Sequence, residues 1–127
     1  MIDLKKLQNA TVAALEDIKA RDIDVFDVTH LTTMFDRVII ASADSARQLK
    51  ALAGNLQEKA KAAGGRIYGV EGEEGGDWAL NDLGDIVVHI MQPAVRSHYN
   101  LEELWGQPKP RKPRERRPKV KARKRGK

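Results

Sequence analysis

Apolar residues recur along two stretches of the chain with the spacing of an amphipathic helix. In residues 3–20 they form one stripe, and Asp3 is placed to cap its first turn. In residues 45–63, Ser45 and Gln48 fit a capping box, and the glycines at 64 and 65 supply a left-handed stop. The pattern predicts two helices that each bury one face; the stripes are Leu4, Leu7, Thr11, Ala14, Leu15, Ile18 and Leu49, Leu52, Ala53, Leu56, Ala60.

Short β-branched or apolar runs between these helices and after them predict five strands. They lie at 25–28, 37–42, 66–70, 78–82 and 85–91. The last run is apolar apart from His89, which indicates a central strand, and only Leu83 and Gly84 join it to the run before. Pro93 suits the first turn of a final helix that ends at Trp105 and Gly106. The order α-β-β-α-β-β-β-α predicts an α/β fold, a mixed sheet with helices packed on it.

Charge divides the chain of 127 residues into two parts. Residues 107–127 hold 12 Lys or Arg and one acid, a net charge of +11. Residues 1–106 hold 11 basic and 17 acidic side chains, a net charge of −6, so the total of +5 describes neither part. We therefore expect one folded domain at 1–106 and a basic, proline-rich tail at 107–127 that is disordered in isolation.

The composition of the chain excludes several classes of protein. The chain has no cysteine, so disulfide frameworks and thiolate metal sites are excluded. No apolar run approaches the roughly 18 residues of a membrane span, and the first residues do not resemble a signal peptide. We expect a cytoplasmic protein with no membrane partner.

Several short motifs, in register over residues 1–106, resemble the ribosomal silencing factor family RsfS (Iojap/YbeB). In the first half they are DVFDV at 24–28, FDRVIIAS at 35–42 and SARQL at 45–49. The second half is more specific, with GVEG at 69–72, DW at 77–78, DLGDIVVHIM at 82–91 and RSHYNLEELW at 96–105. The basic tail lies beyond the stretch that carries this resemblance.

The resemblance implies a nucleotidyltransferase-like α/β fold without nucleotidyltransferase activity. It also implies a partner, ribosomal protein L-fourteen, on the face of the large subunit that meets the small subunit. A factor bound there blocks subunit joining and represses translation under nutrient limitation. The resemblance further suggests a homodimer off the ribosome, with the strand faces of Val38 or Val87 as possible contacts; the edge strands are not identified without the sheet order.

The stretch from Glu71 to Trp78 is the strongest candidate for a partner-binding site. A tryptophan there serves as a core anchor or as an interface anchor, and the acidic, glycine-rich approach through Asp77 favours the interface. A basic ribosomal protein would complement these acids. Tyr99 is a weaker candidate, because core packing is the default for the apolar residues of the last helix: Tyr99, Leu101, Leu104 and Trp105.

Catalytic and metal sites find little support. The acids in EGEEGGD at 71–77 lack calcium-loop spacing, so a solvated acidic loop is the simpler interpretation. Nucleotidyl transfer needs converging acids beside a Gly-Ser motif, which this chain lacks, although its candidate acids are Asp22, Asp24, Asp82 and Asp85. His89 fits a hydrogen-bonded sheet histidine better than a base. We predict no catalytic residue, no metal and no cofactor.

The tail has two interpretations. It is either a solubilising extension or a non-specific tether to ribosomal RNA, because clustered cations release the counterions of phosphates. It has no aromatic residue, so base stacking is not expected. The tether hypothesis assigns phosphate contacts to Lys109, Arg111, Lys112, Arg114, Arg116 and Arg117.

Three functions therefore stay open. The first is a silencing factor that docks on the large subunit and blocks joining without turnover. The second is a metal-dependent nucleotidyltransferase that acts on RNA. The third is a scaffold for large-subunit assembly, which the same docking surface would serve.

Overall fold

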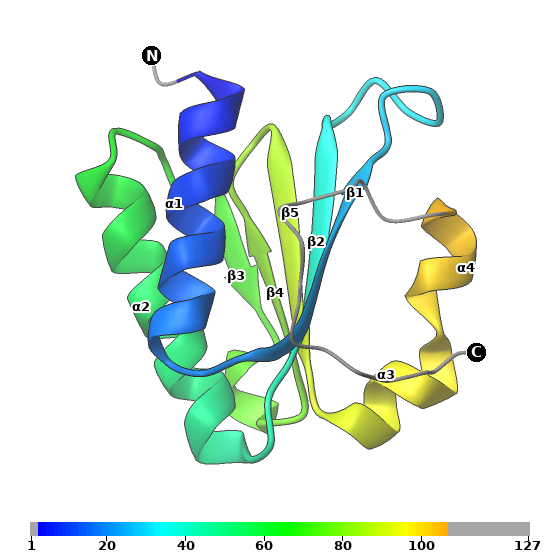
Figure 1. Cartoon of the computed structure of the whole chain (residues 1–127). Helices are drawn as coiled ribbons and strands as arrows, with labels where there is room; N and C mark the ends of the chain where they lie inside the picture. The colour runs from blue at the N-terminus through cyan, green and yellow to red at the C-terminus, as the bar shows by residue number, and fades with distance from the viewer. Residues whose placement is uncertain (1–2, 107–127) are drawn as a thin grey trace.

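Five strands form one mixed sheet with helices on both faces (Figure 1). The computed structural model of the chain describes residues 3–106. Along the chain, the elements are α1 (Leu4–Asp17), β1 (Arg21–Asp27), β2 (Arg37–Ser42), α2 (Ala46–Ala62), β3 (Gly69–Glu71), the short 3-10 helix η1 (Glu73–Gly75), β4 (Trp78–Asp82), β5 (Ile86–Met91), α3 (Pro93–Tyr99) and α4 (Leu101–Trp105). The predicted α/β class and its mixed sheet are confirmed.

The strand order in the sheet is β1-β2-β5-β4-β3. Strands β2 and β5 are parallel, and the other three pairs are antiparallel. The prediction that β5 is central is therefore correct. The suggested dimer contact at Val38 is wrong, because β2 is paired on both sides and Val38 is fully buried. The edge strands of the sheet are β1 and β3.

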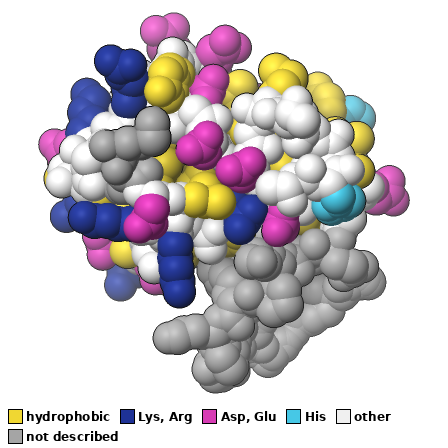
Figure 2. Space-filling model, turned by 90° about the horizontal axis from the view of Figure 1, so that it is seen from above, with side chains coloured by type: hydrophobic (Ala, Val, Ile, Leu, Met, Phe, Trp, Pro, Cys, Tyr) yellow, Lys and Arg dark blue, Asp and Glu magenta, His cyan; other side chains and the backbone are white. Residues whose placement is uncertain are grey.

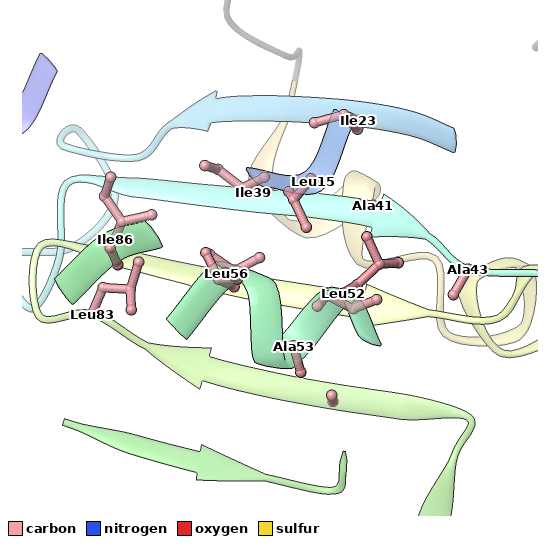
Figure 3. Packing of buried hydrophobic residues seen from close by; sticks show 14 of the residues in the cluster. Leu15, Ile23, Ile39, Ala41, Ala43, Leu52, Ala53, Leu56, Leu83 and Ile86 are labelled. Atoms are coloured by element: carbon pink, nitrogen blue, oxygen red, sulfur yellow. The ribbon is translucent and has the colours of Figure 1, made fainter. Parts of the chain in front are cut away.

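Helices α1 and α2 cover one face of the sheet and enclose the larger core (Figures 1 and 3). The predicted stripe of α2 is buried along its whole length, and Leu52 and Leu56 point toward the sheet. Asp3 caps α1 and Ser45 caps α2, as predicted. The Gln48 side chain does not complete the capping box: its oxygen accepts from the Asp44 amide, and its nitrogen donates to two carbonyls at the end of α1.

Helices α3 and α4 lie on the other face, over β1 and β2 (Figure 1). They close a second, smaller core around Phe26, Val38 and Ile40, with Phe35 and Trp105 packed at its margin. The described helices leave the β4 half of this face open, where side chains from neighbouring strands are only half-buried. This open half positions the candidate site.

The prediction of one continuous last helix is wrong. Asn100, with φ 48° and ψ 55°, ends α3 in the left-handed conformation, and α4 starts directly after it. Asparagine tolerates this conformation because its short side chain costs little there. The expectation that the apolar residues of the last helix all pack in the core is also wrong, because Tyr99 and Leu104 are 54% and 63% exposed. Leu101 and Trp105 do pack on the smaller core.

The predicted bounds of other elements also change. Helix α1 ends at Asp17 rather than at residue 20, because Lys19 adopts a left-handed φ of 66°. Strand β1 begins earlier, at Arg21, and contains an irregularity at Asp22, where φ is 50°. Strand β3 is shorter than predicted, since only Gly69–Glu71 pairs with β4.

Seen from above, charged side chains of both signs reach the surface of the domain (Figure 2). Lysines and arginines lie mainly on the left of this view, and acids are scattered across all of it. Exposed apolar side chains include Leu31 and Met34 of the β1–β2 loop and Leu104 of α4. Within residues 3–106, no helix has both the length and the apolar character needed to cross a membrane.

Candidate functional site at the start of β4

A pocket of about 420 Å³ opens on the uncovered half of the sheet, where β4 begins. We call it the Trp78 pocket; its lining residues are Glu71, Gly72, Gly75, Asp77, Trp78, Leu80 and His89. Three of the four residues predicted to bind a partner line it, namely Glu71, Asp77 and Trp78. The fourth, Tyr99, contacts the Trp78 ring from α3. The structure therefore brings the predicted set together.

Strand alternation places these side chains on one face. Trp78 and Leu80 are two residues apart on β4, so both point away from the larger core. Leu80 is directly opposite His89 of β5 on one side and Glu71 of β3 on the other. Three neighbouring strands thus contribute to one pocket wall.

The glycine-rich loop forms the rim of the pocket through two left-handed residues. Gly72 and Gly76, with φ of 81° and 84°, bracket the single 3-10 turn Glu73–Gly75. A Cβ atom at Gly72 would lie 2.3 Å from the Trp78 carbonyl oxygen, and one at Gly76 would lie 2.7 Å from the Ala46 Cβ. Both positions therefore require glycine. Glu71 and Asp77, which line the pocket, are exposed, and so is Glu74 of the same loop.

Trp78 is held from two sides. Its indole Nε1 donates a hydrogen bond of 3.1 Å to His89 Nδ1, and its ring lies 4.8 Å from the Tyr99 ring, centroid to centroid. The indole N–H is therefore used within the domain, and a partner would meet the ring. Trp78 also packs against the smaller core while it lines the pocket, so it is half-buried.

His89 is the hydrogen-bonded sheet histidine that the sequence predicts. Because Nδ1 accepts from Trp78, the ring proton of the neutral form is on Nε2. Desolvation by burial lowers the pKa of His89 from 6.5 to about 4, so its imidazole is neutral at pH 7. Lysine and arginine are absent from the seven lining residues. At neutral pH the pocket therefore combines an apolar, aromatic wall with a negatively charged rim.

Comparison with known proteins identifies the family. The family model described as "Ribosomal silencing factor during starvation" (RsfS) matches residues 2–127. This chain belongs to the RsfS family. It is 50% identical over 109 residues to a ribosomal silencing factor RsfS from Chromobacterium violaceum, an alignment that covers 86% of this chain and 89% of the relative.

Structural similarity agrees with this assignment. A crystal structure of a protein from Chromobacterium violaceum has a TM-score of 0.82 and 49% sequence identity, and the match covers 87% of this chain and 92% of that one. A more distant relative from Mus musculus, named mitochondrial assembly of ribosomal large subunit protein 1, is 34% identical over 97 residues. That match covers 74% of this chain and 42% of the mouse protein.

In this RsfS-family domain, the four acids considered for catalysis do not converge. Asp22 and Asp24 belong to edge strand β1, whereas Asp82 and Asp85 flank the β4–β5 turn, with β2 and β5 between β1 and β4. Asp24 pairs with Arg96, and Asp82 accepts from the Gly84 amide at 2.8 Å. Within residues 3–106, no three histidine, cysteine or acidic side chains are grouped to hold a metal ion. The predicted tail contacts, from Lys109 to Arg117, lie outside the described residues.

Two residues of the pocket wall were not predicted from the sequence: Leu80, and His89 as a residue that faces the pocket. Strand alternation from Trp78 could have found Leu80, which is two residues further along the same strand. It could not have found His89, because only the register of β4 against β5 places it opposite Leu80. Arg96 was also missed; it is 9% exposed and packs beneath the segment that carries Tyr99.

Proposed function

We propose that this RsfS-family protein docks its Trp78 pocket on ribosomal protein L-fourteen and thereby blocks joining of the ribosomal subunits. The observation that carries the proposal is the pocket itself, in which a half-buried tryptophan and an exposed tyrosine meet a rim of carboxylates. Large aromatic side chains that present an apolar surface beside polar groups are the usual anchors of protein interfaces.

The charge of the rim indicates the chemistry of the partner. Glu71 and Asp77 line a pocket that has no basic side chain among its described lining residues, so a surface rich in lysine or arginine would complement it. Such complementarity raises the association rate and fixes orientation more than it raises affinity. A lysine or arginine of the partner that enters the pocket would also contact the Trp78 ring, where a cation is attracted by the π electrons.

Silencing by this route needs occupancy and no turnover. A domain bound on the subunit interface competes with the small subunit, so the protein shifts the joining equilibrium by mass action. We therefore propose that the protein is a translational regulator of the cytoplasm and not an enzyme. The separation of its candidate acids on different strands supports this view over the RNA-directed nucleotidyltransferase.

Co-sedimentation with separated ribosomal subunits tests the proposal. We expect the protein to pellet with large subunits and to stay in solution with small subunits. Trp78→Ala should weaken large-subunit binding by about 2 kcal/mol, the loss typical of an interface anchor. Trp105→Ala is the matched control, because it truncates a tryptophan of the smaller core outside the pocket. Equal pelleting with both subunits would leave only non-specific charge as an explanation.

A charge reversal tests the rim separately from the aromatic wall. Glu71→Lys should slow association with L-fourteen and weaken binding most at low salt, where screening is weakest. Glu58→Lys adds the same charge on the exposed side of α2, on the opposite face of the sheet, and should bind like the parent protein. If both variants bind equally weakly, the effect is one of net charge and the docking face is assigned wrongly.

A role in large-subunit assembly is the second candidate. The observation that favours it is the relative from Mus musculus, whose name refers to assembly of the mitochondrial ribosomal large subunit. The same face would dock on a precursor particle instead of a finished subunit. Depletion of the protein in cells distinguishes the two, since an assembly factor leaves immature large subunits and a silencing factor leaves mature subunits that join excessively.

For the tail at 107–127, which lies outside the described residues, we propose a non-specific tether to ribosomal RNA. Its twelve cations would add a salt-dependent term to the affinity, and the domain would supply the specific term.

A further inference from the structure

Helix α3 contacts both parts of the Trp78 pocket. At its start, the Gln92 backbone amide donates to the Asp77 carbonyl at 2.9 Å, and the Gln92 side-chain amide donates to the Gly76 carbonyl at 2.6 Å. At its end, the Tyr99 ring packs on the Trp78 ring. The place of α3 on the sheet therefore sets the acidic rim and the aromatic wall together.

Helix α3 cannot hold this place by itself. It has seven residues and is followed by a left-handed Asn100, and a helix this short is marginal without tertiary contacts. Its one buried side chain is Arg96, in the middle of the helix. Val95 packs at the margin of the smaller core, and Arg96 supplies the polar contacts that orient the helix.

The Arg96 guanidinium donates four hydrogen bonds to three other elements. Nε donates to Glu102 of α4 at 2.6 Å, and Nη2 donates to Asp24 of β1 at 2.8 Å. Nη1 donates to the Ser42 hydroxyl of β2 at 2.9 Å and to the Asp22 carbonyl at 2.7 Å. That carbonyl belongs to the irregular residue of β1, whose positive φ accompanies the shift in register.

These contacts define the orientation of α3 more than a hydrophobic contact would. The guanidinium is planar and its donors have a fixed fork geometry, so its partners specify rotation as well as distance. Because the guanidinium is buried and charged, moving the helix would break these four hydrogen bonds and leave a buried cation unpaired, at a high cost. Arg96 therefore permits essentially one arrangement of α3 on β1 and β2.

We infer that Arg96 is the positioning residue of the Trp78 pocket: it contacts no part of the pocket but holds α3 so that Tyr99 meets Trp78 and Gln92 meets the rim. The consequence for partner binding rests on the function proposed above. The consequence for the geometry of the pocket is independent of that proposed function.

Two measurements on Arg96→Gln test the inference. In solution NMR, contacts between the Tyr99 and Trp78 rings should give nuclear Overhauser effects that weaken in the variant, and the Trp78 indole N–H resonance should shift. In co-sedimentation, large-subunit binding should weaken about tenfold or more, the loss that a displaced anchor gives. The Trp78 resonance is assigned with Trp105→Phe.

Arg37→Gln is the matched control. Arg37 of β2 is a comparably buried arginine that pairs with an aspartate of β1, as Arg96 does. Its side chain is 14% exposed against 10% for the Arg96 side chain, and its Nη1 lies 3.4 Å from Asp27 Oδ1. It lies at the opposite end of the β1–β2 pair and should change neither the ring contacts nor the affinity. If Arg96→Gln does not fold, Arg96→Lys replaces it, because lysine keeps the charge against Asp24 and loses the fork.

The outcomes separate this inference from the proposed function. A folded Arg96 variant with unchanged ring contacts overturns the inference. A variant that loses the ring contacts but keeps full affinity supports the positioning role of Arg96 and counts against docking through the Trp78 pocket. If the parent protein does not bind large subunits at all, the proposed function fails, and the ring contacts alone decide whether Arg96 positions the pocket.

Discussion

The buried His89 makes the stability of this domain depend on pH in a predictable direction. Its pKa falls from 6.5 to about 4 on folding, because burial disfavours the imidazolium. Between these two pH values the unfolded chain binds a proton that the folded chain does not. Stability is therefore fully present above about pH 6.5 and is lost as the pH falls toward 4.

The magnitude follows from the shift. One pKa unit corresponds to about 1.4 kcal/mol, so the full shift is worth about 3 kcal/mol. Between about pH 7.5 and about pH 4.5, most of that difference, roughly 2–3 kcal/mol, should appear as a lower free energy of unfolding. Protonation at still lower pH would also remove the acceptor that His89 Nδ1 offers to the Trp78 indole.

Urea unfolding of the parent protein and His89→Gln at both pH values measures this contribution. The glutamine oxygen can still accept from Trp78, and glutamine does not titrate. All other groups are the same in the two proteins, so their effects largely cancel in the comparison. The parent should lose roughly 2–3 kcal/mol more than the variant on acidification. His30→Gln, which removes an exposed histidine, is the control. Equal losses in the parent and in His89→Gln would refute the reasoning.

Three further outcomes are expected. Gly72→Ala should destabilise the domain by more than about 1 kcal/mol in a thermal or urea melt, because it places a Cβ in a left-handed, filled position, whereas Gly54→Ala, in an open position of α2, should be neutral or stabilising. The isolated protein should show no Mg²⁺-dependent nucleotide incorporation or hydrolysis, and activity abolished by Asp82→Asn or Asp85→Asn would contradict the proposed function. Deletion of 107–127 should reduce the slope of log affinity against log salt while subunit joining stays inhibited; an unchanged slope would exclude phosphate contacts by the tail.

Much of the fold could be predicted from the sequence, because it depends on signals contained within each element. The stripes of α1 and α2 follow helical periodicity, and both N-terminal caps are local hydrogen bonds. The central place of β5 is indicated by its nearly continuous apolar run, which is typical of strands in the interior of a sheet. Glu71, Asp77 and Trp78 were found together because the loop that joins them is short and glycine-rich.

The rest depended on contacts between residues far apart in the chain. Tyr99 meets Trp78, His89 faces Leu80, and Arg96 reaches Asp24 across 72 positions. Periodicity reports which face of its own element a residue occupies, but it carries no information about which element packs there. The break at Asn100 shows the same limit, because Pro93 and the apolar residues after it predict one last helix, whereas the backbone turns at Asn100. The sequence alone determined the elements and the character of the Trp78 loop, whereas the pocket and the residue that positions it exist only in the tertiary structure, where long-range packing and hydrogen bonds outweigh local preference.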